Sequence, residues 1–439
     1  MRPDFLFVYE HKARELDNLC LIKAELENRG YDVSITHCNN YPRYKYRYLE
    51  KPKVILHFCL RRSDDLDYIY AIVGRFNKLV NMQWEQVLSI DERDIAFSIP
   101  KDKAKLATHI CWGEEAYERL KKNGVKNAVP TGAVQLDFLK GRLREYYYSK
   151  ETLIEKYALP SNRIFLYISS YSGAALPERE AAEIVRLETS TTFQSIKKKE
   201  QERELVLEWL IEIMNKYQDS CVIYRPHPSE NLDDKILKIA QRHERFLIIP
   251  EESVKQWILA SDYVFTTCST AIAEVFYANK PCSIMKPLLG EGPPEMSIYL
   301  KARVCGRIED VMYEIEHPDL GFPIADNVIA YHYGENSDEY AYKKVADLLE
   351  TVLTTSIYNF HFKPSKLAYQ RRCKDLIKRL IVRFRITETT WPFCKIPKIR
   401  NWLEFFGYYW NKQLKEDVVS MSDIEERTIR LRRLIGDCN

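Results

Sequence analysis

Two consecutive strand-loop-helix patterns between residues 220 and 287 constrain the fold of this chain most. Apolar runs at 221–224 and 263–265 each end in a cluster of small and polar residues, and a helical pattern follows each cluster. The carboxyl ends of parallel strands lie at one edge of an open α/β sheet, where ligands bind. We therefore expect both clusters to line a single site. The clusters are Arg225-Pro226-His227-Pro228 and Thr266-Thr267-Cys268-Ser269-Thr270.

The residue types in these clusters suit a bound phosphate. Arg225 brings a fixed positive charge, and His227 lies between prolines that restrict its backbone. Ser269 and Thr270 open a predicted helix, and the free N–H groups at such an end attract anions. Glu274 lies one turn further on, where it can accept hydrogen bonds from a ribose. The alternatives are a structural histidine and helix capping by Ser269.

These clusters resemble the HP and S motifs of bacterial surface-carbohydrate transferases, a group that contains sialyl-, polysialyl- and Kdo-transferases using CMP-sugars. The CDP-glycerol glycerophosphotransferases of teichoic-acid synthesis are similar. The resemblance implies an α/β protein of the GT-B fold, with two Rossmann-like domains facing a cleft. It further implies a metal-independent, inverting glycosyltransferase of surface polysaccharide synthesis, with a nucleotide-activated sugar, preferably a CMP-sugar, as donor.

A length of 439 residues suits two domains and an extension. We expect an amino-terminal acceptor domain at 1–150, a nucleotide-donor domain at 151–355 and a basic, aromatic helical extension at 356–439. No glycine-rich fingerprint follows the first apolar run, so no dinucleotide or other cofactor is expected. The strands are predicted at 5–9, 31–36, 54–58, 79–82 and 108–112, and then at 163–169, 221–224, 246–249, 263–265 and 281–285.

Other polar residues of the second domain are assigned from their position in the pattern. Ser170 and Ser172 follow the strand at 163–169, so they form either a third wall of the donor pocket or a plain turn. The lysines at 197–199 are expected on a solvated helix face. Lys286 is expected to be an ordinary surface lysine, with added charge for the pocket as the alternative.

The general base is expected in the first domain, across the cleft. Glu10 and Glu15 follow the first strand, Glu85 follows the fourth, and His11 lies beside Glu10. In the resembled enzymes a Glu and an Arg-Glu pair in this loop face the acceptor, which implies such a role for Glu10 and Glu15. The sequence does not choose among these residues, and His227 is a further catalytic candidate.

No metal site is expected. Asp65-Leu66-Asp67 is the Asp-x-Asp motif of the chain, and the charged stretch before it predicts that it lies on a helix surface. A cationic clamp also makes a divalent ion unnecessary for stabilising the leaving phosphate.

The charge and the targeting signals of the sequence limit which partners and which compartment we expect. The 66 basic and 63 acidic residues leave a net charge of +3, which argues against a nucleic-acid partner. The amino terminus reads as neither a signal peptide nor a spanning helix, and the eleven cysteines show no paired spacing. We therefore expect a cytoplasmic protein that transfers to a glycan or lipid-linked glycan acceptor.

Residues 362–415 mix basic and aromatic side chains, and the apolar stripe within them contains Cys373, Leu376, Ile377, Leu380, Ile381 and Phe384. The segment suits an anionic membrane surface at the inner face of the cell membrane, or packs on the protein itself.

Three other functions fit the same sequence. A CDP-glycerol or CDP-alditol phosphotransferase would hold a diphosphate in the same clamp. A non-hydrolysing sugar-nucleotide epimerase shares the fold, but it normally carries paired glutamates where only Glu274 is present. A non-catalytic, membrane-associated scaffold is the third alternative.

Overall fold

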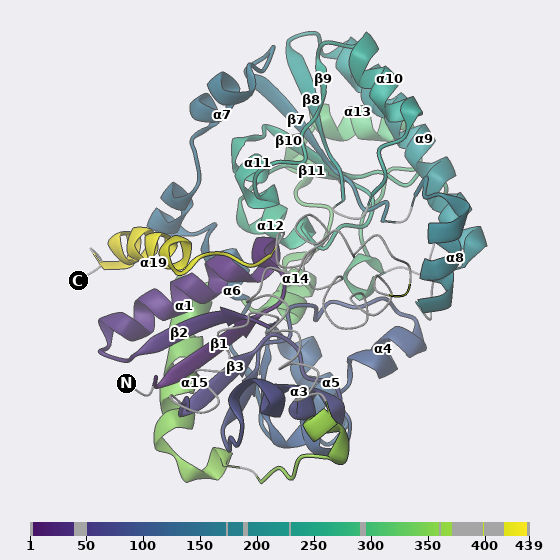
Figure 1. The fold of residues 1–439 in the computed structure, drawn as a ribbon. Coiled ribbons are helices and arrows are strands. Elements are labelled where there is room, and N and C mark those ends of the chain that lie inside the picture. Colours follow the sequence, from purple (N-terminus) through teal and green to yellow (C-terminus); the bar gives the residue numbers. More distant parts are fainter. Residues whose placement is uncertain are drawn as a thin grey trace. The chain divides into compact units, whose positions relative to one another are not determined.

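The computed structural model describes residues 3–38, 51–172, 174–187, 192–227, 230–289, 296–359, 361–370, 398 and 417–436. The chain divides into two compact units, each built around a parallel sheet (Figure 1). Neither unit is continuous in sequence. Unit 1 contains Met1–Gln86, Ser98–Gln135 and Glu339–Asn439, and unit 2 contains Val87–Phe97 and Leu136–Asp338.

The sheet of unit 1 has the strand order β2-β1-β3-β4-β5-β6, and all its pairs are parallel. The central strands are buried along their length, as expected for a parallel sheet covered on both faces. The five predicted strands are confirmed; the sixth, β6, has only three residues and was not predicted. The strands are β1 (Phe5–Tyr9), β2 (Val33–His37), β3 (Val54–His57), β4 (Leu79–Asn81), β5 (Thr108–Cys111) and β6 (Ala128–Pro130).

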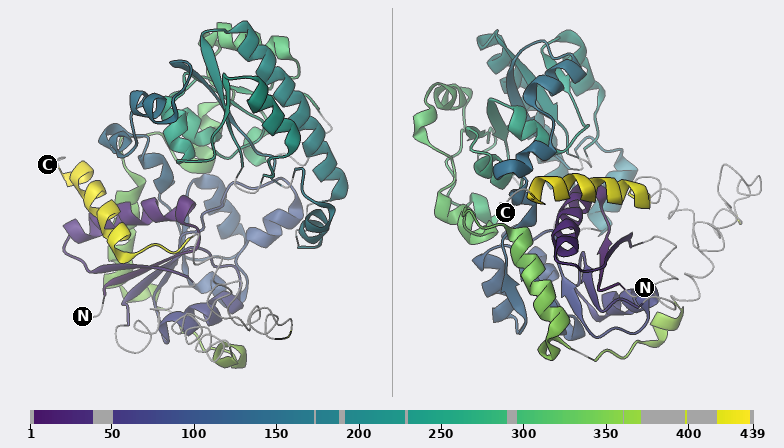
Figure 2. Two further views of the ribbon diagram at one scale, coloured as in Figure 1. Left: turned by 45° about the horizontal axis from the view of Figure 1, so that its top comes forward. Right: turned by 90° about the vertical axis from the view of Figure 1, so that its left-hand side faces the viewer.

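Helices from both ends of the chain belong to unit 1. The late helix α15 and the carboxyl-terminal helix α19 both pack against α1, and α19 lies beside α1 in every view (Figures 1 and 2). A π-helical turn, η1, precedes α1 directly after β1. The elements are η1 (Lys12–Leu16), α1 (Asp17–Asn28), α3 (Ser63–Val73), η2 (Asp102–Leu106), α5 (Glu114–Lys122), α15 (Ala341–Thr354), η6 (Ser356–Tyr358) and α19 (Met421–Gly436).

The sheet of unit 2 has the order β11-β10-β7-β8-β9, again with parallel pairs only. All five strands were predicted from their apolar runs. Because β7 is central, β8 and β10 flank it on either side. The strands are β7 (Arg163–Ile168), β8 (Ser220–Arg225), β9 (Phe246–Ile248), β10 (Tyr263–Thr266) and β11 (Cys282–Ile284).

The longest helix of unit 2, α9, buries one face against β7, β8 and β10. Side-chain caps start several helices: Thr192 forms a capping box with Ser195, and Asp233 accepts the Ile236 N–H. The helices are α7 (Lys150–Tyr157), α8 (Glu178–Leu187), α9 (Phe193–Lys216), α10 (Asp234–Arg242), α11 (Val254–Ala260), α12 (Ile272–Tyr277), α13 (Ile308–Glu316) and α14 (Asp326–Tyr333). Short elements are α4 (Glu92–Ser98), α6 (Val134–Asp137), η3 (Gly141–Tyr146), η4 (Ser297–Tyr299) and η5 (Pro318–Leu320).

The Asp-x-Asp motif is not on a helix surface as predicted. Asp67 is buried on α3, and its carboxylate accepts hydrogen bonds from the Ser365 backbone N–H at 3.0 Å and from the Ser365 hydroxyl. Asp65 accepts the backbone N–H groups of Arg61 and Arg62 at the start of the same helix. Both carboxylates therefore serve the packing and capping of α3.

Most of the basic, aromatic segment at 362–415 lies outside the described residues, and so does its predicted apolar stripe. Within the part of the chain that is described, no helix combines the length and the apolar character needed to cross a membrane.

Candidate functional site

Three strand ends meet at one edge of the sheet in unit 2. Ile168, the last residue of β7, is paired with Arg225 on β8 and with Thr266 on β10. The loops after these strands therefore start at the same level. The Ser169 backbone N–H donates to the Arg225 carbonyl at 3.0 Å, and the Cys268 thiol lies 3.2 Å from the Ser170 hydroxyl. The structure thus brings the two predicted clusters and the Ser170 loop together.

His227 follows β8 at this edge, and its ring feels the charge of Lys199 on α9, which was expected on a solvated face. Burial, and secondly the charge of Lys199, lower the pKa of His227, which favours the neutral ring. The Lys199 ammonium group lies 3.3 Å from the Ser172 carbonyl oxygen and 3.5 Å from the Ser172 hydroxyl. The prediction that Lys199 belongs to a solvated face is therefore wrong, because the tertiary fold turns this part of α9 toward the strand ends.

A buried carboxylate, Glu230, holds the His227 loop in place. Its Oε2 accepts the His227 backbone N–H at 3.0 Å and the Ser169 hydroxyl, and its Oε1 accepts the Tyr224 hydroxyl. The guanidinium of Arg203, on α9, balances its charge at 3.5 Å, and both side chains are almost fully buried, at 0% exposed for Glu230 and 2% for Arg203. Sequence reasoning missed Glu230, although it stands three residues after the histidine.

Three buried tyrosines, Tyr167, Tyr171 and Tyr224, contact these loops from within unit 2. Thr267 shares its hydroxyl with the hydroxyls of Tyr167, at 2.8 Å, and Tyr171, at 3.0 Å. Tyr167 also stacks on Tyr224, with ring centroids 5.3 Å apart. Burial raises the pKa of all three phenols well above the usual value, so they remain neutral donors. Their contacts fix the loop after β10 relative to β7 and β8.

Arg225 is placed at the expected edge, and its guanidinium binds the loop after β9. It donates to the carbonyls of Ile249 at 3.2 Å, Glu251 at 2.7 Å and Glu252 at 2.6 Å, in the loop after β9. These three contacts use both terminal nitrogens of the guanidinium. Arg225 therefore organises the neighbouring loop, and its role toward a phosphate stays a prediction.

The loop that carries Ser269 and Thr270 is held through its backbone. The Ser269 carbonyl accepts the Tyr299 hydroxyl at 2.6 Å, and the Thr270 carbonyl accepts the Tyr333 hydroxyl at 3.1 Å. The Ser269 hydroxyl accepts the Ala271 N–H at 3.2 Å, while the Thr270 side chain is exposed. Ser269 therefore acts at least as a cap of this turn.

The helix after this loop, α12, has six residues. Glu274 is half-buried on it, and burial raises the pKa of its carboxyl group. Lys286, after the adjacent strand β11, is 9% exposed and so is not the surface lysine that was expected.

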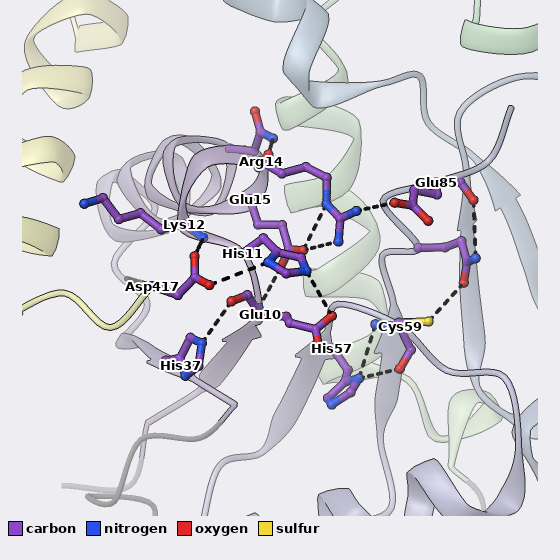
Figure 3. A network of polar contacts seen from close by, with 12 residues as sticks. Glu10, His11, Lys12, Arg14, Glu15, His37, His57, Cys59, Glu85 and Asp417 are labelled. Atoms are coloured by element: carbon purple, nitrogen blue, oxygen red, sulfur yellow. Dashed lines mark hydrogen bonds and ion pairs between the residues drawn. The ribbon is translucent and has the colours of Figure 1, made fainter. Parts of the chain in front are cut away.

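In unit 1, Arg14 of the π-helical turn binds two of the predicted carboxylates, Glu15 and Glu85, and the third, Glu10, lies just before this turn (Figure 3). Such turns are rare and recur at functional sites. Arg14 donates to Glu15 Oε1 at 2.8 Å and also binds Glu85, and the Glu10 backbone N–H donates to Glu15 Oε2 at 2.8 Å. The structure thus unites residues from the ends of β1 and β4.

These carboxylates differ in their surroundings. Glu15 is fully buried with both oxygens bonded, and burial raises its pKa against the opposing effects of the Glu10 N–H and Arg14. Glu85 is 62% exposed and pairs with Arg14. The Glu10 carboxylate is 35% exposed, with the His11 ring 3.8 Å away. Glu15 is enclosed and Glu85 is a surface residue paired with Arg14. Glu10 is therefore the carboxylate that is partly buried and still accessible to a substrate.

No family model and no curated protein matches this sequence. Solved structures do resemble it. The UDP-GlcNAc 2-epimerase from Methanocaldococcus jannaschii superposes with a TM-score of 0.50 and 12% identity, covering 80% of this chain and 100% of that chain. A variant of the wall teichoic acid polymerase TagF gives a TM-score of 0.51 and 12% identity, covering 80% and 89%. A TagF variant soaked with CDPG gives 0.50 and 11%, covering 80% and 88%. With its two parallel-sheet α/β units, the chain has the expected GT-B fold.

Proposed function

We propose that this chain is a metal-independent transferase that takes a group from a nucleotide-activated donor, with a sugar on CMP as the favoured donor. The observation that carries the proposal is the edge of unit 2, where three strand ends in register gather the neutral ring of His227 and the cation of Lys199 beside the hydroxyl-rich turn at 267–270. A half-buried cation and neutral donors stabilise the charge that grows on a leaving phosphate.

In this proposal Lys199 takes the role first expected of Arg225. The bond between the donor sugar carbon and the phosphate oxygen breaks, and the electron pair stays on the phosphate, which Lys199 and His227 stabilise. Ser170, Ser172, Ser269 and Thr270 border the same edge and supply hydroxyl groups. The Glu274 carboxylate, one turn beyond Thr270, is proposed to accept hydrogen bonds from the ribose.

Unit 1 is proposed to carry the acceptor base. Glu10 is the favoured candidate, because its carboxylate is accessible and the Glu15 oxygens are already occupied. Glu15 is then a positioning residue for the Glu10 backbone, and Glu85 holds Arg14. Acceptor, surface-polysaccharide product and attachment to the inner face of a membrane through residues 362–415 stay predictions.

Two alternatives keep specific support. Structures of TagF and of a UDP-GlcNAc 2-epimerase share the fold of this chain. A CDP-alditol phosphotransferase would bind a diphosphate at the same edge and break a P–O bond, and an epimerase would bind UDP. The nucleotide preference therefore separates these functions.

The test is a thermal-shift panel of CMP, CDP, UDP and GDP on the wild type, His227→Ala and Lys199→Met, followed by calorimetric titration. Lys197→Met is the matched control, because Lys197 lies on the same helix with its side chain exposed. A nucleotide at a hundred times its Kd stabilises the protein by about 2.7 kcal/mol, which raises Tm by about 5–10 °C for a unit of this size. We expect Lys199→Met to weaken binding by about 10–100-fold, the value of a hydrogen bond to a charged group, and Lys197→Met to leave it unchanged.

Stabilisation by CMP alone supports the CMP-sugar donor, whereas a preference for CDP or UDP selects the phosphotransferase or the epimerase. Absence of binding by all four nucleotides contradicts the proposal and favours the scaffold. Equal effects of the two lysine substitutions would show that phosphate binds elsewhere.

A further inference from the structure

The carboxyl-terminal segment returns to the loop that follows the first strand. Helix α19 is fastened along α1 by ion pairs of Arg427 with Asp17 and of Arg432 with Glu27 (Figure 2). The segment just before α19, residues 417–420, is thereby held at the end of β1. A part of the chain some four hundred residues away in sequence thus reaches the candidate acceptor base.

Asp417 is tied to this loop by both its backbone and its side chain (Figure 3). The Tyr9 hydroxyl donates to the Asp417 carbonyl at 3.0 Å and accepts the Val419 N–H at 3.3 Å. The Asp417 Oδ1 accepts the Lys12 backbone N–H at 2.9 Å. The other oxygen of the Asp417 carboxylate, Oδ2, lies 3.6 Å from Nδ1 of His11. The Asp417 side chain is 19% exposed, so its charge is only partly screened.

The ring of His11 lies between two carboxylates from different parts of the chain. Nδ1 faces Asp417 at 3.6 Å, and Nε2 faces Glu10 Oε2 at 3.8 Å. Of the other charged side chains of this loop, Arg14 and Glu15 are paired with each other. Both separations are below 4 Å, and catalytic contacts often shorten when substrate binds.

We propose that Asp417 is a positioning residue that turns His11 toward Glu10 and completes a proton relay. This inference rests on the proposed transferase function. With Nδ1–H donating to Asp417, the lone pair of His11 is on Nε2 and points at the Glu10 carboxylate. Glu10 takes the proton of the acceptor hydroxyl and passes it to Nε2, while the acceptor oxygen bonds to the donor carbon and the phosphate leaves with the electron pair.

The physical reason is the one that places a carboxylate behind a catalytic histidine in hydrolases: the carboxylate selects the ring tautomer and stabilises the imidazolium that forms. Asp417 is well suited to this task because its backbone is fixed independently of its carboxylate. The sequence could not indicate the relay, since Asp417 stands in no motif shared with residues 10–15.

The test uses two measurements: which ring nitrogen of His11 carries the proton, and the rate at which nucleotide is released from the donor. Asp417→Asn keeps the size of the side chain and an acceptor for the Lys12 N–H but removes the charge. Asp423→Asn is the control, because Asp423 accepts the Ser420 N–H at the start of the same helix and lies outside the relay. Ring nitrogens of His11 are observed by NMR in histidine-labelled full-length protein, with His11→Gln for assignment. Nucleotide release is measured from CMP-sialic acid, CDP-glycerol and UDP-N-acetylglucosamine.

We expect the wild type and Asp423→Asn to carry the His11 proton on Nδ1, and Asp417→Asn to carry it on Nε2. We expect kcat for nucleotide release to fall about 10-fold in Asp417→Asn, with the donor KM unchanged, since orienting a base is a fraction of its total contribution. In the His11→Gln background the Asp417→Asn substitution should cause no further loss, because both residues act through one ring.

An unchanged tautomer in Asp417→Asn, or losses that multiply in the double variant, overturns the relay while leaving the transferase intact. A wild type that releases nucleotide from none of the three donors contradicts the proposed function and the catalytic part of this inference together. In that case the tautomer result alone reports whether Asp417 orients the ring.

Discussion

Replacement of Glu230 by glutamine tests whether one buried carboxylate holds the histidine loop of unit 2. The side chain accepts from the His227 backbone N–H, the Ser169 hydroxyl and the Tyr224 hydroxyl, and it pairs with Arg203. Glutamine has the same shape but a single acceptor oxygen and no charge. We expect the oxygen to remain at the His227 and Ser169 side, because a backbone N–H cannot rotate away.

The loss of stability in Glu230→Gln comes from the partners of the second carboxylate oxygen, which glutamine replaces with an amide nitrogen. The amide group then faces Tyr224 and the Arg203 guanidinium, which lose a charged acceptor. A hydrogen bond to a charged group is worth about 1.5–3 kcal/mol. Arg203 keeps Asp233 and the Asn231 carbonyl as partners, which limits the penalty for its unpaired charge. We therefore expect about 2–3 kcal/mol of destabilisation, which lowers Tm by about 4–12 °C for a unit of this size.

The assay for Glu230→Gln is the thermal transition of unit 2, followed by calorimetry, with Glu204→Gln as the control. Glu204 pairs with Lys235 at the surface, with side chains 48% and 66% exposed, and such pairs contribute at most about 1 kcal/mol. Should both variants melt within 1 °C of each other, the carboxylate does not hold the loop and the reasoning fails. Nucleotide affinity measured on the same samples shows whether His227 has moved.

Two further predictions concern unit 1. Glu10→Gln should lower kcat for nucleotide transfer by about 10²–10⁴-fold without changing donor affinity, as removal of a general base does. Glu15→Gln should instead lower Tm. If Glu15→Gln lowers kcat and Glu10→Gln lowers Tm, the two residues exchange their roles. Burial lowers the pKa of His57 and His109 to about 4. Between about pH 6.5 and 4 the unfolded chain therefore binds more protons than the folded one. The free energy of unfolding of unit 1 should fall by up to about 3 kcal/mol per histidine as pH falls through that window. His109→Gln should flatten Tm against pH, and the exposed His361→Gln should not; equal curves for both variants would contradict the assignment.

The fold was largely predictable because its signals are local. Ten predicted strands are present. Buried parallel strands leave continuous apolar runs, which the sequence shows directly. The short strand β6 was missed because three residues give too little pattern, and the return of α15 and α19 to unit 1 leaves no trace in local periodicity.

The candidate site was predictable only in part. The strand-end rule placed His227 and Ser269 at one edge, but it gave no side-chain direction, so it did not predict that Arg225 binds three carbonyls of the neighbouring loop. Lys199 is one of three consecutive lysines, and only the orientation of α9 distinguishes it from its neighbours.

By itself, the order of apolar and polar residues determined that this chain forms parallel α/β sheets and which loops follow each strand, because burial of a strand and its exit from the sheet depend on adjacent residues. Tertiary structure decided which side chains meet in those loops. Lys199 reaches His227 from another helix, and Asp417 reaches His11 from the far end of the chain. Their contacts depend on the packing of whole elements, which no single stretch of sequence specifies.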